Sequence, residues 1–180
     1  MKQALIVVDV QNDYFTGGKM PLSLPERALS QINKLEEHFL KNQLPIIYIQ
    51  HIKDDPQAPF FGRGTKGAQL HSDLKVNSSS IIIEKQYPNS FLQTNLAQLL
   101  QSLQVQQVVV TGMMTHMCID STTRASAERG YQPILISDAT TTRKLKVQER
   151  EVLADEVQGA FIAALQTFAQ VLTTSDYLRQ

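Results

Sequence analysis

The chain has 180 residues, a usual length for one domain, so we expect a single domain over residues 1–180 with an ordinary buried core. Its 17 lysines and arginines balance 17 aspartates and glutamates, which leaves no overall charge to attract nucleic acid or an anionic membrane. A lone cysteine excludes an internal disulfide, and no stretch approaches the roughly 20 apolar residues of a membrane span, so we expect a cytoplasmic protein with neither kind of partner.

Short runs rich in β-branched residues predict six strands along the chain. They cover residues 4–10, 45–50, 80–84, 107–111, 133–137 and, more weakly, 171–173. Because these runs are apolar on both alternating faces, they suit strands that helices cover on both sides.

Apolar residues three and four positions apart predict helices between these strands. The helical segments lie at residues 29–40, 92–103, 117–129 and 152–168, and Gly130 suits the left-handed turn after the third. Alternating strands and helices imply right-handed crossovers, so the expected fold is α/β, with three α/β/α layers around a mostly parallel six-stranded sheet. The long irregular stretch 53–77 is a candidate for covering the substrate or contacting another subunit.

Three reactive side chains follow predicted strands at the carboxyl edge of the sheet, where parallel sheets bind ligands. They are Asp9, Lys85 and Cys118. Each also has a structural explanation: a turn-capping carboxylate, a solvated loop charge and a small buried hydrophobe. If Thr115 caps the following helix, Cys118 lies in its first turn, where free amides and the helix dipole lower a thiol pKa.

Three segments together carry a family resemblance. Residues 5–15 (LIVVDVQNDYF), 84–91 (EKQYPNSF) and 111–122 (TGMMTHMCIDST) resemble the three motifs of isochorismatase-like cysteine hydrolases. The resemblance implies a sheet with strand order 3-2-1-4-5-6. In that order the main chain of Lys85 lies two strands, or roughly 10 Å, from that of Asp9. A 2-1-3 arrangement would place the two residues closer.

The resemblance also implies roles for individual residues. Asp9 is the general base, Lys85 its electrostatic partner and Cys118 the nucleophile. A cis peptide between Met113 and Met114 would aim the Met114 amide, with that of Cys118, at a developing oxyanion.

Other side chains near the motifs are candidates for the substrate pocket. These are Phe15, Tyr87, Phe91, His116 and Ile119. Phe91 and Ile119 suit the core equally well, and His116 suits a local hydrogen-bonding role. The apolar members would form a wall for a small organic amide.

No cofactor and no metal is expected. The nicotinamidase branch of the family places an aspartate and then a histidine just after the second strand, but this chain has His51 and Lys53 there. A protonated lysine is no metal ligand, and His51 and His71 alone would supply only two ligands.

The favoured function is hydrolysis of a C–N bond, in an amide or ureide of a small molecule, through an acyl-enzyme on Cys118. Two alternatives remain: hydrolysis of the vinyl ether isochorismate, which needs no thiol, and a non-catalytic binding protein. The family and the apolar residues Phe60 and Phe61 in the long loop predict a homo-oligomer, a dimer or tetramer, because a monomer would have difficulty covering them.

Overall fold

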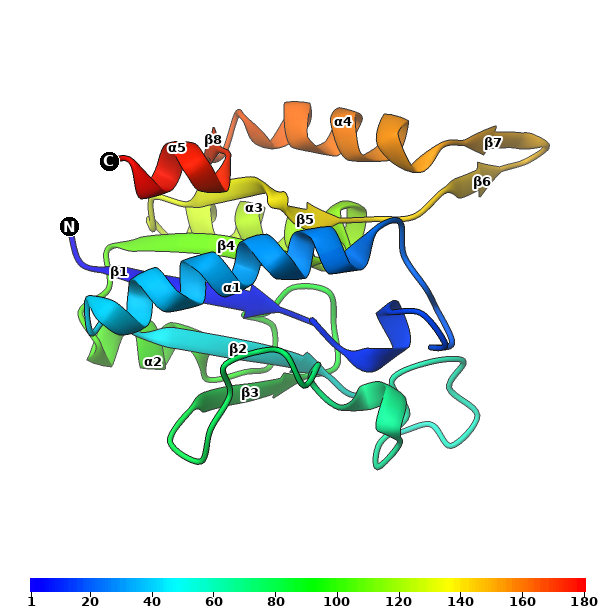
Figure 1. Ribbon diagram of the computed structural model, residues 1–180, viewed down its shortest axis with the longest axis horizontal. Helices are drawn as coiled ribbons and strands as arrows, with labels where there is room; N and C mark the ends of the chain where they lie inside the picture. The colour runs from blue at the N-terminus through cyan, green and yellow to red at the C-terminus, as the bar shows by residue number, and fades with distance from the viewer.

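The sheet runs through the whole molecule, which is described here over all 180 residues from a computed structural model (Figure 1). All five pairings in the sheet are parallel. The strand order is β3-β2-β1-β4-β5-β8, which confirms the predicted order because β8 is the sixth strand of this sheet. The strands are β1 (Gln3–Val8), β2 (Ile46–His51), β3 (Ile81–Lys85), β4 (Gln107–Met113), β5 (Ile134–Thr141) and β8 (Gln170–Leu172).

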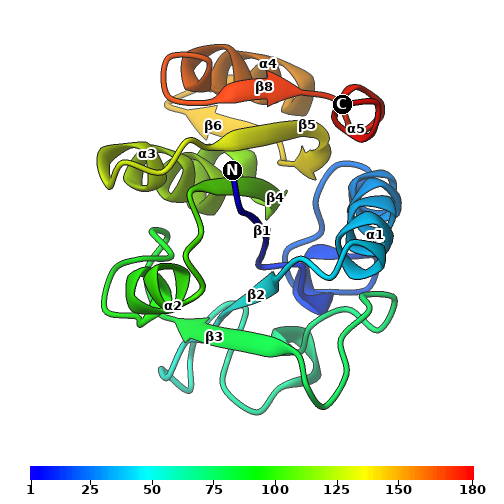
Figure 2. The ribbon, with the colours of Figure 1, turned by 90° about the vertical axis from the view of Figure 1, so that its left-hand side faces the viewer.

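Helices cover both faces of this sheet (Figure 2). On one face lie α1 (Pro25–Lys41) and α5 (Thr174–Leu178); on the other lie α2 (Leu96–Ser102), α3 (Asp120–Glu128) and α4 (Ala154–Leu165). Each face has its own core, one of 22 and one of 17 buried residues. The α/β/α layers are therefore confirmed. No helix is both long enough and apolar enough to cross a bilayer.

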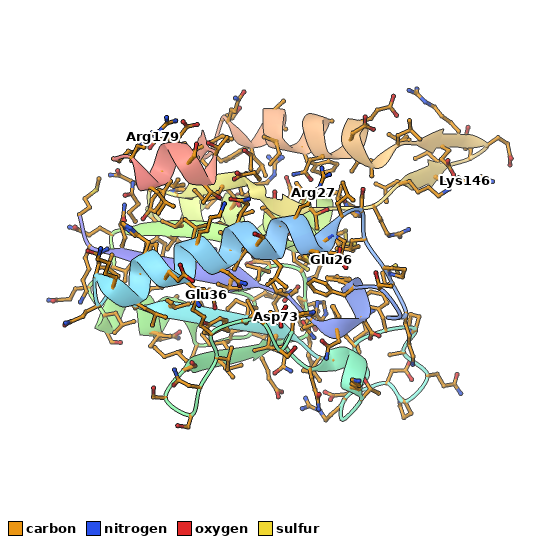
Figure 3. All side chains as sticks on the ribbon, in the orientation of Figure 1. Glu26, Arg27, Glu36, Asp73, Lys146 and Arg179 are labelled. Carbon is orange, nitrogen blue, oxygen red and sulfur yellow. The ribbon has the colours of Figure 1, made fainter.

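The structure departs from the predicted elements in two places. Helix α2 begins at Leu96 rather than at residue 92, and Val152 belongs to a strand rather than to the last helix. That strand, β7 (Arg150–Val152), pairs with β6 (Leu145–Val147) in an antiparallel hairpin that the sequence did not predict. The hairpin extends past the end of α4, with Lys146 on it (Figures 1 and 3).

Two buried side chains of the first motif hold the long loop against the sheet. Gln11 bridges the main chain of His51 and Ala68 with three hydrogen bonds of 2.7–2.9 Å. Asp13 accepts a hydrogen bond of 2.7 Å from the Phe61 amide. A Cβ atom on Gly67 would lie 2.1 Å from Oδ1 of Asp13, so this carboxylate fits only because residue 67 is glycine. The loop is thus fixed to the strand end that carries Asp9.

The phenylalanines of the loop pack within one chain. Phe61 is fully buried and packs edge-on against Tyr14, with 4.6 Å between ring centroids. Phe60 is half-buried, and the Lys53 ammonium lies 3.5 Å from its ring centroid. The expectation that a monomer would have difficulty covering these residues is therefore wrong for Phe61, which is covered within one chain, whereas Phe60 remains partly exposed.

Candidate active site

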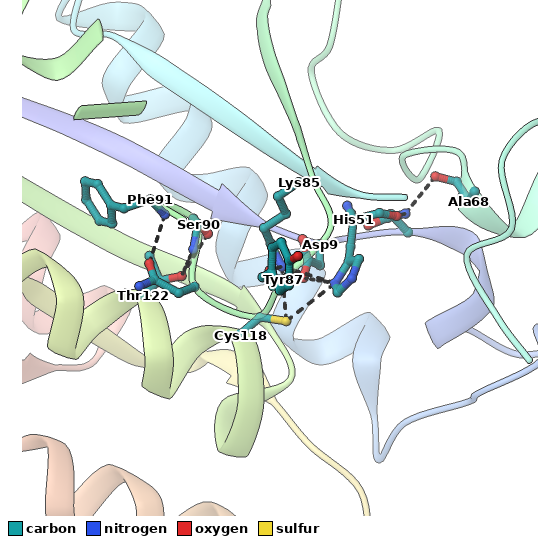
Figure 4. A network of polar contacts seen from close by, with 11 residues as sticks. Asp9, His51, Ala68, Lys85, Tyr87, Ser90, Phe91, Cys118 and Thr122 are labelled. Carbon is teal, nitrogen blue, oxygen red and sulfur yellow. Dashed lines mark hydrogen bonds and ion pairs between the residues drawn. The ribbon is translucent and has the colours of Figure 1, made fainter. Parts of the chain in front are cut away.

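Three elements bring Asp9, Lys85 and Cys118 together at the carboxyl edge of the sheet (Figure 4). Asp9 directly follows β1, Lys85 ends β3, and Cys118 lies in a π-turn, η3 (Thr115–Ile119), after β4. The Lys85 Nζ atom lies 2.8 Å from Asp9 Oδ2 and 3.2 Å from Cys118 Sγ. The residues predicted from the motifs therefore form one buried cluster.

Lys85 joins the cluster by reaching across β2. It pairs in register with His51 on β2, and β2 lies between β3 and β1. Its ammonium donates a 3.0 Å hydrogen bond to the Tyr87 carbonyl, and its side chain has no exposed surface. The length of the lysine stem thus spans the two-strand separation that the order 3-2-1 imposes.

Gly112 allows β4 to approach β1 where the cluster forms. Its φ is +119°, and a Cβ atom there would lie 2.0 Å from the carbonyl oxygen of Val8. Only glycine fits this backbone. The Met113–Met114 peptide bond that follows is cis, and both side chains are buried.

Asp9 and Lys85 form an ion pair that keeps both groups charged. Burial is the largest single influence on the pKa of Asp9 and raises it, but the Lys85 ammonium, His51 and Cys118 together lower it more, so the net shift is downward. Burial likewise opposes the charge of Lys85, yet Asp9 and Cys118 raise its pKa above the usual value. Apart from this ion pair, neither Asp9 oxygen accepts a hydrogen bond. The carboxylate is therefore free to accept a proton.

Cys118 is a thiol in the resting protein. Burial, and then the charge of Asp9, raise its pKa well above the usual range, while Lys85 opposes them. The predicted lowering is wrong for two reasons. Thr115 is not a helix cap, since its hydroxyl has no hydrogen-bond partner, and Cys118 is only 3% exposed. A buried thiol needs a base to react, and Asp9 is adjacent.

This protonation state predicts slow alkylation of native Cys118. Each unit by which a thiol pKa rises above about 8.5 lowers the thiolate fraction near neutral pH tenfold. With iodoacetamide at pH 7.5, we expect the native protein to be labelled at least about tenfold more slowly than the urea-unfolded chain. Adduct mass against time measures both rates. Native labelling as fast as that of the unfolded chain would mean that Lys85 outweighs burial and Asp9.

His51 is a fourth member of the cluster. Its Nδ1 atom lies 3.2 Å from Lys85 Nζ, 3.7 Å from Asp9 Oδ2 and 3.9 Å from Cys118 Sγ. From the sequence, His51 is a candidate only for a metal ligand. His51 ends β2, the strand that lies between the strands of Asp9 and Lys85. That position could have indicated that His51 contacts both residues.

Two of the predicted pocket residues lie in the core. Phe91 is buried against the Tyr131 ring, with the Arg129 guanidinium 4.8 Å from its ring centroid. Ile119 has no exposed surface and packs in the same core. Both therefore have the structural role that was the alternative to a pocket wall.

The other three have different settings, and only Tyr87 contacts the cluster. Phe15 is buried against the His71 ring, with 4.2 Å between centroids. Tyr87 keeps 40% of its surface exposed, while its carbonyl holds Lys85. His116 is half-buried, and its Nδ1 lies 2.5 Å from the Thr142 hydroxyl.

The residues at the nicotinamidase metal position do not form a comparable site. Lys53 lies over the Phe60 ring, and His71 packs at a tilt against the Phe15 ring and accepts a hydrogen bond from the Asp73 amide. His51 instead groups with Asp9 and Cys118. These contacts do not fit a metal cofactor held by residues 51, 53 and 71.

Arg143 is a cation that the sequence analysis did not single out. It follows β5, and its Nε atom is buried without a hydrogen-bond partner. After burial, its charge is the main cause that lowers the pKa of His116. The Arg143 charge also lowers the pKa of the Tyr14 hydroxyl, which burial and then the charges of Cys118 and Asp9 raise. Arg143 therefore has a buried N–H donor, at Nε, without a hydrogen-bond partner.

Comparisons with known proteins agree on one family. The family model described as the isochorismatase domain matches residues 3–176. The isochorismatase family protein YddQ of Bacillus subtilis strain 168 is 41% identical over 180 residues, covering 99% of this chain and all of that protein. The crystal structure of an isochorismatase hydrolase from Oleispira antarctica superimposes with a TM-score of 0.95 at 35% identity, covering 99% and 97% of the two chains. Nicotinamidase 3 of Arabidopsis thaliana is more distant, 22% identical over 162 residues, covering 83% of this chain and 78% of that protein.

Proposed function

Because the chain belongs to the isochorismatase family of hydrolases, we propose that it cleaves a C–N bond, in an amide or ureide of a small molecule, through an acyl-enzyme on Cys118. One observation carries this proposal. The Cys118 thiol lies beside a buried ammonium, Lys85, and a buried carboxylate, Asp9, whose Oδ1 atom accepts no hydrogen bond. Thiol, base and cation are the groups that nucleophilic cleavage of an amide requires.

In the first half of the reaction, Cys118 becomes acylated. Its sulfur attacks the substrate carbonyl while Asp9 takes the thiol proton, and Lys85 stabilises the developing thiolate. The main-chain amides of Met114 and Cys118 stabilise the oxyanion of the tetrahedral intermediate. Asp9 then returns the proton to the nitrogen, which leaves as ammonia or an amine.

In the second half, water cleaves the thioester. Asp9 is again a carboxylate once the amine has left, so it takes a proton from the attacking water. The carbon–sulfur bond breaks, and the proton returns to the sulfur. The product is a carboxylic acid, or a carbamic acid when the substrate is a ureide.

The amidase name of a relative supports a C–N bond over other bonds. Nicotinamidase 3 of Arabidopsis thaliana is an amidase by name and covers most of this chain. Cys118 itself also favours this chemistry, because cleavage of a vinyl ether needs an acid and no thiol.

A panel of substrates tests the proposal. Amides, ureides and isochorismate are supplied to the purified protein in the presence of a chelator, since we propose that no metal takes part. Each amide is tried with and without a carboxylate group, because the unpaired Nε of Arg143 would favour an anionic substrate. Turnover of isochorismate alone would replace the proposal with vinyl ether hydrolysis, and no turnover of any member would favour a binding protein.

We also propose that the protein is a homo-oligomer, for a reason other than the loop phenylalanines. The β6–β7 hairpin extends from the body of the molecule, and Val147 on it is 63% exposed (Figure 1). Light scattering at micromolar concentration tests this, since a mass near 20.2 kDa would indicate a monomer.

A further inference from the structure

Four polar atoms lie within 3.2 Å of the Lys85 ammonium nitrogen. They are Asp9 Oδ2 at 2.8 Å, the Tyr87 carbonyl at 3.0 Å, Cys118 Sγ at 3.2 Å and His51 Nδ1 at 3.2 Å (Figure 4). An ammonium has only three protons to donate. These four atoms therefore outnumber the protons of the ammonium, and their arrangement around one positive charge is that of a small cation-binding site.

Three of these atoms belong to side chains that also bind metals. Carboxylate oxygen, imidazole nitrogen and thiolate sulfur are all ligands of Zn²⁺. The Asp9, His51 and Cys118 atoms lie within 4.8 Å of one another. The Sγ–Nδ1 and Nδ1–Oδ2 distances are 3.9 and 3.7 Å. Ligand atoms around tetrahedral zinc are roughly 3.3–3.6 Å apart, so these two pairs need shifts of only a few tenths of an ångström. The third pair, Asp9 and Cys118, lies within 4.8 Å and needs the largest adjustment.

We propose that Asp9, His51 and Cys118 form a site for a thiophilic divalent cation of the Zn²⁺ class, and that the Lys85 ammonium occupies this site and excludes the metal. The site differs from one built on residues 51, 53 and 71, because its ligands are the reactive groups themselves. The inference rests on these contacts alone and does not depend on the proposed hydrolysis.

The exclusion has a simple electrostatic origin. A divalent ion can enter only if the ammonium withdraws, since the two positive charges would otherwise lie within a few ångströms of each other in a buried site. The Cys118 thiol must also lose its proton to solvent, so that the sulfur binds the metal as thiolate. Removing the ammonium removes the first obstacle and leaves an uncompensated Asp9 carboxylate, which further favours a cation.

Lys85→Ala tests the proposal with Co²⁺, a coloured substitute for Zn²⁺. We expect the variant to bind one equivalent at pH 7.5, with a thiolate-to-cobalt charge-transfer band and the visible bands of tetrahedral cobalt. The wild-type protein should bind at least about 100-fold more weakly. The charge-transfer band should be absent in Lys85→Ala/Cys118→Ala, and affinity should fall in Lys85→Ala/His51→Ala. Lys53→Ala is the matched control, since it removes a nearby ammonium that contacts the Phe60 ring instead, and it should behave as wild type.

Two results would overturn the proposal: a folded Lys85→Ala variant without the charge-transfer band, or wild-type protein that binds Co²⁺ as tightly as the variant. If Lys85→Ala does not fold alone, it is refolded with Co²⁺ and followed by circular dichroism. Metal-dependent recovery together with the band would support the site, because a ligand of the folded state stabilises it. Failure to recover would count against it.

Discussion

Cys118→Ala should lower kcat/KM by at least about 10⁴-fold on the best substrate of the panel, because the acyl-enzyme cannot form without the sulfur. The fold should remain, since the change removes one atom from a tightly packed position. Measurements of kcat/KM and far-ultraviolet circular dichroism on the same preparations test both statements.

Met117→Ala is the matched control for this substitution. It shortens the neighbouring side chain, which is 41% exposed and belongs to neither core. We expect its activity to stay near that of wild type. If Cys118→Ala also kept near wild-type activity, the acyl-enzyme mechanism would be wrong, and acid-catalysed vinyl ether cleavage would become the better explanation.

Asp9→Asn should lower both activity and stability. Loss of a general base reduces the rate by about 10²–10⁴-fold. Breaking a buried ion pair, which leaves Lys85 without its counter-charge, costs about 3–5 kcal/mol in the free energy of unfolding. Denaturant unfolding measures the second effect independently of any substrate. A variant as stable as wild type would show that the pair contributes no net stability.

The pH dependence of that stability difference separates charge from packing. The folded-state pKa of Asp9 lies below its unfolded value of about 3.9, so the ion pair stabilises the fold above that pH. The difference between wild type and Asp9→Asn should therefore be full at pH 7 and narrow as the pH falls below about 4. Glu151→Gln breaks an exposed 2.8 Å pair with Lys144 and should change stability by less than about 1 kcal/mol.

Five strands of the main sheet could be predicted because they are apolar and five to eight residues long, whereas β8 has only three residues and gave a weaker signal. A run such as residues 107–111 is too rich in β-branched residues for a helix and too apolar for a surface strand. The β6–β7 hairpin could not be found in this way, since its strands are three residues long and largely exposed. The apolar spacing predicts that the last helix begins at Val152, because the sequence of a three-residue strand cannot be distinguished from that of a first helical turn.

The proximity of three residues of the cluster could be predicted, but the contact of His51 and the electrostatics could not. The motif residues Asp9, Lys85 and Cys118 lie together because the carboxyl ends of parallel strands meet at one edge. The pKa of Cys118 depends on how deeply the π-turn buries the sulfur and on its distance from Asp9. The contact of His51 depends on the direction of a ring at a strand end. Neither property is encoded in local sequence spacing.

The packing of Asp13 against Gly67 has a consequence for how these positions change in evolution. A Cβ atom at residue 67 would overlap the carboxylate that binds the Phe61 amide, so any larger residue there requires a smaller one at residue 13. A shorter side chain at residue 13 would in turn lose the loop's anchor, and another group would have to bind that amide. Positions 13 and 67 are 54 residues apart in the chain. Among relatives we nevertheless expect these two positions to vary as a pair, and we expect changes in the length of the intervening loop to leave both positions in contact.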